Sequence, residues 1–188
     1  MKTRAILLLL ALSLLAGCGD RRLVINIDVL SYVAPADRGQ SFGPIPAVPP
    51  DGAVVPESPL VNDQEVQLLE GLTGLATVQA VTISANLFHQ STSGTGSDTL
   101  RLYLSPADVP SLTTSPVFER AFVFTPGVAE STQVEVSGDA RVVDLFNSRK
   151  FRFSVTTSLR GPSTGPALSG RVEIHALHCV VVSSRKPL

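Results

Sequence analysis

The sequence is poor in the residue types that usually build ligand sites and disulfides. Its 188 residues include no Trp, two Cys and two Tyr, which are Tyr32 and Tyr103. Sugar-binding sandwiches commonly stack their ligands on Trp or Tyr, because these rings combine an apolar face with a polar group. The chain also lacks CxxC, HExxH and P-loop motifs. These absences predict a non-enzymatic protein with no cofactor and no metal site.

Long apolar runs and an excess of one charge are missing as well. The formal net charge is −1, whereas a nucleic-acid surface needs a basic stripe. The nearest basic cluster, residues 149–152 (Arg-Lys-Phe-Arg), is more typical of a solvated strand edge. A transmembrane helix needs about 20 apolar residues, but the run at residues 5–15 has 11 positions and includes Ser13. We therefore predict neither a nucleic-acid partner nor a membrane-spanning helix.

The first 17 residues have the three parts of a secretory signal. Residues 1–4 carry two positive charges, residues 5–15 are almost entirely apolar, and the small pair Ala16-Gly17 precedes Cys18. A charged start, a short apolar segment and small residues before a cleavage point define such signals. This pattern predicts that residues 1–17 are removed on export.

Residues 15–18, Leu-Ala-Gly-Cys, resemble the lipobox of bacterial lipoproteins. The resemblance covers only the first 18 residues, and the alternative is an ordinary secretion signal with a chance cysteine. It implies a mature chain that begins at Cys18, with diacylglycerol on the sulfur and usually a third acyl chain on the amine. Two or more acyl chains give stable anchoring to membrane lipid. Gly19 follows Cys18, in place of the aspartate typical of inner-membrane retention, so the membrane and leaflet stay open.

The rest of the chain has the size of one domain. Removing residues 1–17 leaves 171 residues, in which 13 basic side chains face 16 acidic ones, a net charge of −3. This length is sufficient for one hydrophobic core. We assign residues 18–22 to the lipidated cysteine and a short tether, and residues 23–188 to the domain. If Cys18 carries lipid, Cys179 has no disulfide partner in the chain, and we expect it to be a buried small hydrophobe.

Apolar residues alternate with polar ones along most of the mature chain. This period of two is typical of half-buried strands, because successive side chains of a strand point to opposite faces. About eight or nine such strands, separated by Gly, Pro and Ser, predict an all-β fold, either an antiparallel β-sandwich or a closed barrel. Only short helical turns are expected, within residues 63–72 and 105–112. The residues predicted to face the core are Leu23, Ile25, Ile27, Val29, Val81, Ile83, Ala85, Leu87, Leu100, Leu102, Leu104, Phe118, Phe122, Phe124, Val134, Val136, Phe151, Phe153, Val155, Val172, Ile174, Ala176, His178, Val180 and Val182.

Residues 34–63 interrupt this pattern, because they hold seven of the fourteen prolines. Proline lacks the N–H group that a sheet requires, so the segment cannot be a central strand. We predict one long Pro-rich loop over the domain, or a partly extended arm. Such a segment can present extended backbone to a protein partner.

Residues 161–165 match the G-x-S-x-G pattern of a serine-hydrolase nucleophile elbow, with Ser163 at its centre. That motif requires a strand, a strained turn and then a helix. Here Pro162 and Pro166 flank Ser163, and a further strand is predicted to follow. The pattern therefore indicates a hairpin loop.

A possible metal site involves His175, His178 and Cys179. On a strand, His175 and His178 would face opposite ways, and His175 and Cys179 would lie about 13 Å apart at roughly 3.3 Å per residue. Zinc needs several ligands within about 2.3 Å, so a third ligand such as His89 would be required. We predict no metal site here, and a hydrogen-bonded His178 in the core.

Asp98 ends a polar loop of Gly, Ser and Thr. Calcium takes six to eight oxygen ligands and usually several carboxylates, so one aspartate is weak support for a calcium site. The loop is better explained as a flexible hairpin tip.

These observations favour a lipid-anchored envelope lipoprotein with a structural or protein-interaction role and an envelope protein as its partner. The alternative is a small-molecule or glycan-binding lipoprotein, which requires a pocket lined by Tyr32 or Tyr103. A hydrolase that uses Ser163 is a third hypothesis.

Overall fold

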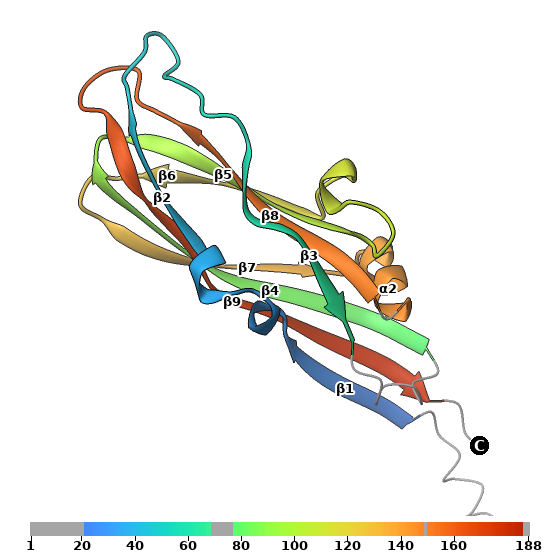
Figure 1. Ribbon diagram of the computed structural model, residues 1–188. Helices are drawn as coiled ribbons and strands as arrows, with labels where there is room; N and C mark the ends of the chain where they lie inside the picture. Colours follow the sequence, from blue (N-terminus) through green and yellow to red (C-terminus); the bar gives the residue numbers. More distant parts are fainter. Residues whose placement is uncertain (1–20, 69–76, 149, 186–188) are drawn as a thin grey trace, which may run out of the picture.

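The computed structural model describes residues 21–68, 77–148 and 150–185. These residues form two antiparallel sheets that face each other (Figure 1). The strands are β1 (Arg21–Asp28), β2 (Gly39–Ile45), β3 (Ser58–Gln67), β4 (Thr77–Ser93), β5 (Gly96–Pro106), β6 (Phe118–Phe124), β7 (Ala129–Ser137), β8 (Lys150–Arg160) and β9 (Leu168–Arg185). The helical elements are η1 (Val29–Tyr32), η2 (Pro35–Asp37), η4 (Ser111–Thr113) and α2 (Ala140–Asn147).

The strand order is that of a jelly roll. One sheet runs β1-β9-β4-β7, with β2 also paired to β9, and the other runs β3-β8-β5-β6. The antiparallel pairs β1–β9, β3–β8, β4–β7 and β5–β6 are nested in the chain, as if one long hairpin had been rolled up into two sheets. This order confirms the predicted antiparallel β-sandwich and excludes the closed barrel as the fold of the described residues.

The core lies between the two sheets. Most of the predicted inward residues of β4, β5, β6 and β8 are buried, which confirms their period-two pattern. Each fully buried aliphatic or aromatic side chain stabilises the fold by about 1.5–3 kcal/mol. The largest fully buried side chains include Phe124, Phe146, Phe151, Phe153 and Leu168.

The predicted inner face of β9 is correct only as far as Ile174. Asn86 of β4 pairs with Ala176, whereas Leu87 pairs with Ile174, so His175 is an extra residue in β9. A bulge of this kind reverses the alternation beyond it.

Leu177, Cys179 and Val181 are therefore buried, and His178 is exposed, so the prediction of a core His178 is wrong. Ala176, Val180 and Val182 are only half-buried. Burial of Cys179 is confirmed, and it raises the pKa of the thiol to about 12.

The Pro-rich residues 34–63 belong to the sandwich. They contain η2, all of β2 and the first part of β3, so the prediction of one continuous loop is corrected. Residues 34–38, which include η2, and residues 46–57 lie outside the strands, apart from a single bridge between Val54 and Arg160. Both β2 and β3 are edge strands, where proline is tolerated.

The helix α2 lies at one end of the sandwich, between β7 and β8 (Figure 1). The Asp139 carboxylate accepts a hydrogen bond from Arg141 N and caps the first turn. Val142, Leu145 and Phe146 are buried. Arg21 and Arg185 pair at this same end, which we call the base. Within the described residues, no helix has the length and apolar character needed to cross a membrane.

Candidate functional site

Four connections meet at the end of the sandwich opposite the base (Figure 1). We call this surface the tip and define it as residues 46–56, 91–97, 123–129 and 161–167. These segments are far apart in the sequence, and the rolled topology brings them together.

Backbone hydrogen bonds join the first and last segments of the tip. Val48 N donates to Pro162 O at 3.1 Å, and Gly161 N donates to Ala53 O at 2.8 Å. Gly52 has a φ of +82°, and a Cβ at this position would lie 2.0 Å from Gly161 O. Because only glycine fits this close approach, the two segments form one fixed frame.

Ser91 joins the other two segments. Its buried hydroxyl donates to Gly94 O at 2.8 Å, and its carbonyl accepts from Gly127 N at 2.9 Å. Gly94 also lies against the last segment, because a Cβ there would be 2.6 Å from Ala167 O. The four connections are thus held together before any partner binds.

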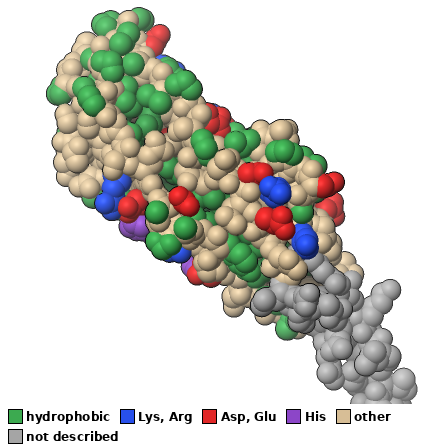
Figure 2. Space-filling model, viewed as in Figure 1, with side chains coloured by type: hydrophobic (Ala, Val, Ile, Leu, Met, Phe, Trp, Pro, Cys, Tyr) green, Lys and Arg blue, Asp and Glu red, His purple; other side chains and the backbone are tan. Residues whose placement is uncertain are grey.

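The surface of the tip is almost without charge. Charged residues make up 16% of the chain, yet Asp51 is the one charged residue in these four segments. The exposed Arg160, one residue before the last segment, donates from Nη1 to Asp51 O at 3.1 Å. Among the described residues, strongly exposed aliphatic side chains on the tip are Val48 (44%), Val54 (57%), Val123 (72%) and Val128 (39%). Figure 2 shows this end mainly in the colours of hydrophobic and uncharged groups. Exposed apolar patches and a low charge content are typical of the centres of protein interfaces.

Ser163 lies exposed on the tip, in the connection between β8 and β9. The strand β9 follows it, where a nucleophile elbow requires a helix. The predicted loop between two strands is therefore present, but β8 and β9 belong to different sheets and do not pair, so the prediction that this loop closes a hairpin is wrong.

The predicted His and Cys cluster is not brought together. His175 and His178 are exposed, whereas Cys179 is buried between the sheets. His89 is buried too, with its ring 5.2 Å from that of Phe122. The described residues contain no group of three or more His, Cys, Asp or Glu side chains that could hold a metal ion.

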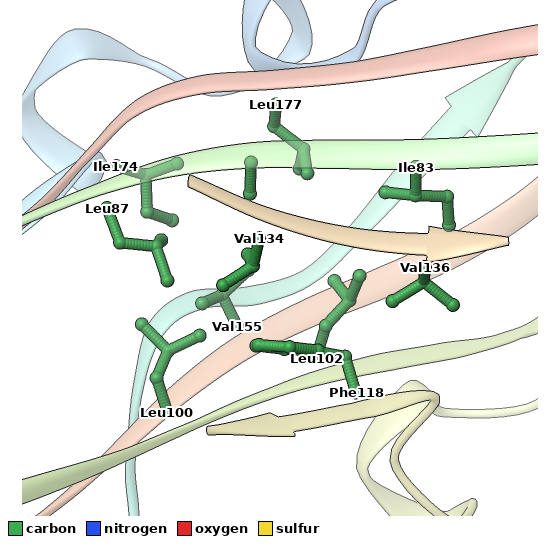
Figure 3. Close-up of a pocket in the computed structure, with 11 residues that line it drawn as sticks. Ile83, Leu87, Leu100, Leu102, Phe118, Val134, Val136, Val155, Ile174 and Leu177 are labelled. Atoms are coloured by element: carbon green, nitrogen blue, oxygen red, sulfur yellow. The ribbon is translucent and has the colours of Figure 1, made fainter. Parts of the chain in front are cut away.

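Both tyrosines are used in internal contacts. Tyr103 donates its hydroxyl hydrogen bond to Glu57 at 2.7 Å, and Tyr32 donates to Gln67 O at 3.4 Å. Neither tyrosine lines the apolar cavity between the sheets (Figure 3), whose volume is about 20 Å³. A cavity of this size holds about one water molecule, so it is too small for a sugar.

Polar side chains on the outer face of the β3-β8-β5-β6 sheet fix the connection between β5 and β6. Asp63 accepts hydrogen bonds from Ser111 N at 2.8 Å and from Arg152 Nη1 at 2.6 Å. The Ser111 backbone bond is the main reason that the pKa of Asp63 is lowered, with further contributions from the Ser111 hydroxyl and Arg152. Asp63 also has a positive φ of 48°, at a register shift of β3. Sequence reasoning missed this network because its members are widely separated in the chain.

Asp98 lies within β5 and is 2% exposed, so it is not part of a flexible hairpin tip. Its side chain accepts a short hydrogen bond from the Thr157 hydroxyl. Burial raises the pKa of Asp98 to about 6, although hydrogen bonds from Thr157, Ser158 and Thr99 act in the opposite direction. The folded protein therefore keeps this carboxyl group protonated up to a higher pH than an ordinary aspartate.

We expect Asp98 to make the fold less stable as the pH rises from 4 to 7. Its folded pKa is above the ordinary value of 3.8, so its contribution is fully present below about pH 4 and is lost as the pH rises through 6. At about 1.4 kcal/mol per pKa unit, the loss is about 3 kcal/mol. Urea unfolding of the wild type and of Asp98→Asn between pH 4 and 7 measures this loss of stability. The loss should be absent in Asp98→Asn, because the amide cannot ionise. Identical pH profiles for the two proteins would contradict this prediction.

The described residues thus define a jelly-roll β-sandwich with a tip that carries few charges. No family model matches the chain. No curated protein matches it either. Similar solved structures include infectious bursal disease virus Gx strain, at 13% identity and a TM-score of 0.43 over 89% of this chain. A second is the T13 particle of the same virus, at 14% identity and a TM-score of 0.45 over 89% of this chain. A third is dimeric latent PorU from Porphyromonas gingivalis, at 10% identity and a TM-score of 0.37 over 88% of this chain. The chain spans 38%, 36% and 13% of those three chains, and the likeness concerns the fold alone.

Proposed function

We propose that this protein is an exported, lipid-anchored envelope lipoprotein with a non-enzymatic role, and that its tip binds another envelope protein. Cys18, the proposed lipidation site, lies outside the described residues. The observation that carries the proposed binding role is the tip, with few charges and four exposed valines, at the end of the sandwich opposite the start of β1.

The geometry supports a role in reaching a partner away from the membrane. Two residues, Gly19 and Asp20, separate Cys18 from β1, and extended residues span at most about 3.6 Å each, so a lipid on Cys18 would keep the base close to the bilayer. The strand β9 has 18 residues and runs from tip to base. At roughly 3.3 Å per residue it is about 60 Å long, so a protein anchored at the base with β9 perpendicular to the bilayer would hold its tip about that far from the lipid headgroups.

The character of the tip favours a protein partner with an apolar surface. Its four segments are already joined by hydrogen bonds, so little ordering entropy is lost on binding. Exposed valines supply apolar area, and the near absence of charge avoids desolvation of ions at the interface centre.

We expect a photoreactive amino acid at Val54 or Val123 to cross-link the membrane-anchored protein to one defined envelope protein. The same amino acid at Gln133, which is exposed on β7 away from the tip, serves as the matched control. Val123→Glu should reduce the Val54 cross-link by about tenfold, because a charge would be buried in the interface. Equal cross-linking from Gln133 and the tip, or none from either, would contradict the proposed role of the tip.

A further inference from the structure

A second hollow lies on the flank of the sandwich, between the η1–η2 segment and β9. It has a volume of about 340 Å³, and the residues that line it include Leu30, Pro35, Ala36, Arg38, Glu173 and His175. This volume lies at the lower end of the range for small-molecule sites. Charged and histidine side chains gather on this flank in Figure 2.

Arg38 presents a fixed guanidinium group at this pocket. Its Nε and Nη2 donate to Val33 O at 3.1 and 3.0 Å, and its backbone carbonyl accepts from Ile174 N at 2.7 Å. The two bonds to Val33 O use the side of the guanidinium group that carries Nε and Nη2. The outer fork formed by Nη1 and Nη2 has no acceptor among the described residues, and such a fork matches a carboxylate with two parallel hydrogen bonds.

Glu173, by contrast, already has two positively charged or polar donors. Its Oε2 accepts from Arg171 Nη2 at 2.7 Å and lies 3.1 Å from His175 Nε2. The His175 ring is fixed by stacking on Phe88, with centroids 5.0 Å apart and planes 14° apart. Burial alone would raise the pKa of Glu173, but His175 and Arg171 lower it overall.

These charges select the kind of ligand. The positive charges of Arg38 and Arg171 on this flank are offset by Glu173, Asp37 and Asp28, so the flank as a whole has no net positive charge. An anion is favoured locally, at the Arg38 fork, because its donors have no acceptor among the described residues. The Glu173 carboxylate would repel a bare anion, so the ligand must also offer hydroxyl donors in its direction. Leu30 and Pro35 supply an apolar wall for a carbon ring.

We propose that this pocket binds a small hydroxylated carboxylate of the size of a sugar acid, with the acid group on the Arg38 fork and hydroxyl groups toward Glu173 and His175. Neither the anchor nor the tip enters the argument, so the proposal stands apart from the proposed function.

The test is a titration of the full chain, purified in detergent, with D-glucuronate, and with D-glucose as the uncharged counterpart. Ligand-observed NMR should detect saturable glucuronate binding in the millimolar range, as expected for so small a ligand. Glucose should bind at least about tenfold more weakly, because it lacks the charge-assisted hydrogen bonds.

Variants at Ala36 separate charge from shape without disturbing the Arg38 contacts. Ala36 is exposed on η2 and lines the pocket, so Ala36→Glu and Ala36→Lys should both fold. Ala36→Glu should weaken glucuronate binding by about tenfold, whereas Ala36→Lys should retain it. Arg38→Gln should abolish glucuronate binding, because it removes the fork that holds the carboxylate. Arg120→Gln, at an exposed arginine on β6, is the matched control and should leave binding unchanged. No saturable binding up to about 20 mM, equal binding of glucose, or equal effects of the two Ala36 variants would overturn the proposal.

Discussion

Replacing Cys18 by serine should release the protein from the membrane fraction. The acyl chains are attached through the cysteine sulfur in the lipobox reading, and serine offers no sulfur. Each buried methylene contributes about 0.8 kcal/mol to membrane affinity, so two or three chains account for essentially all of the anchoring. Fractionation of cells at high salt, followed by mass measurement of the precursor and mature chains, checks both the location and the lipid.

Cys179→Ala is the matched control for this experiment. Cys179 is buried between the sheets and cannot carry a membrane anchor in the folded protein. Its replacement should leave the protein in the membrane fraction. A Cys18→Ser protein that still sediments with membranes at high salt would rule out the lipid anchor, and with it the orientation that we propose for the tip.

Ile174→Ala should lower the free energy of unfolding by about 2–5 kcal/mol, the range for emptying a large aliphatic core site. Ile174 is 2% exposed and lines the cavity between the sheets together with Leu87 and Leu177 (Figure 3). Removing its side chain enlarges a void that already exists, so collapse of the surroundings cannot compensate fully. Urea unfolding, with midpoint and slope compared to the wild type, measures the change.

His178→Ala on the same strand is the control, and it also tests the bulge at His175. The His178 side chain is 54% exposed, and its nearest charged neighbour is Asp28 at 3.8 Å. Its loss should therefore change stability by no more than about 0.5 kcal/mol. If β9 alternated without a bulge, His178 would be in the core and the two substitutions would be similarly costly.

The alternation of apolar and polar residues was sufficient to predict β1 and β4 to β9, but not β2 and β3 or the places where the pattern is interrupted. Residues 63–67, expected within a helical turn, belong to β3. Alternation identified the inner face of β4 through Val81, Ile83 and Leu87, because every second residue of a regular strand points the same way. A bulge adds one residue to a strand without any characteristic residue type, so the sequence could not predict that His178 lies on the outer face of β9. The helix α2 was missed because it has eight residues, too few for a clear period of 3.6.

The Pro-rich segment and the tip show a second limit. Prolines excluded a central strand correctly, but β2 and β3 lie on edges, where the rule does not apply. The tip combines four short segments from across the chain, and none of them carries a motif by itself. Only the pairing of distant strands shows that these four segments, each with few charged residues, lie together on one surface. The lipobox reading of residues 15–18 stays a prediction from the sequence.

The pairing of β1 with the end of β9 has a mechanical consequence. Eight residue pairs, from Arg21–Arg185 to Asp28–His178, join the first strand to the last. A protein held by Cys18 at the base and by a partner at the tip would be pulled along the strand direction. Hydrogen bonds between antiparallel strands run perpendicular to that direction, so the load would act in shear on the whole row at once. A pull across the sheet would instead open the same bonds one after another, at a much smaller force.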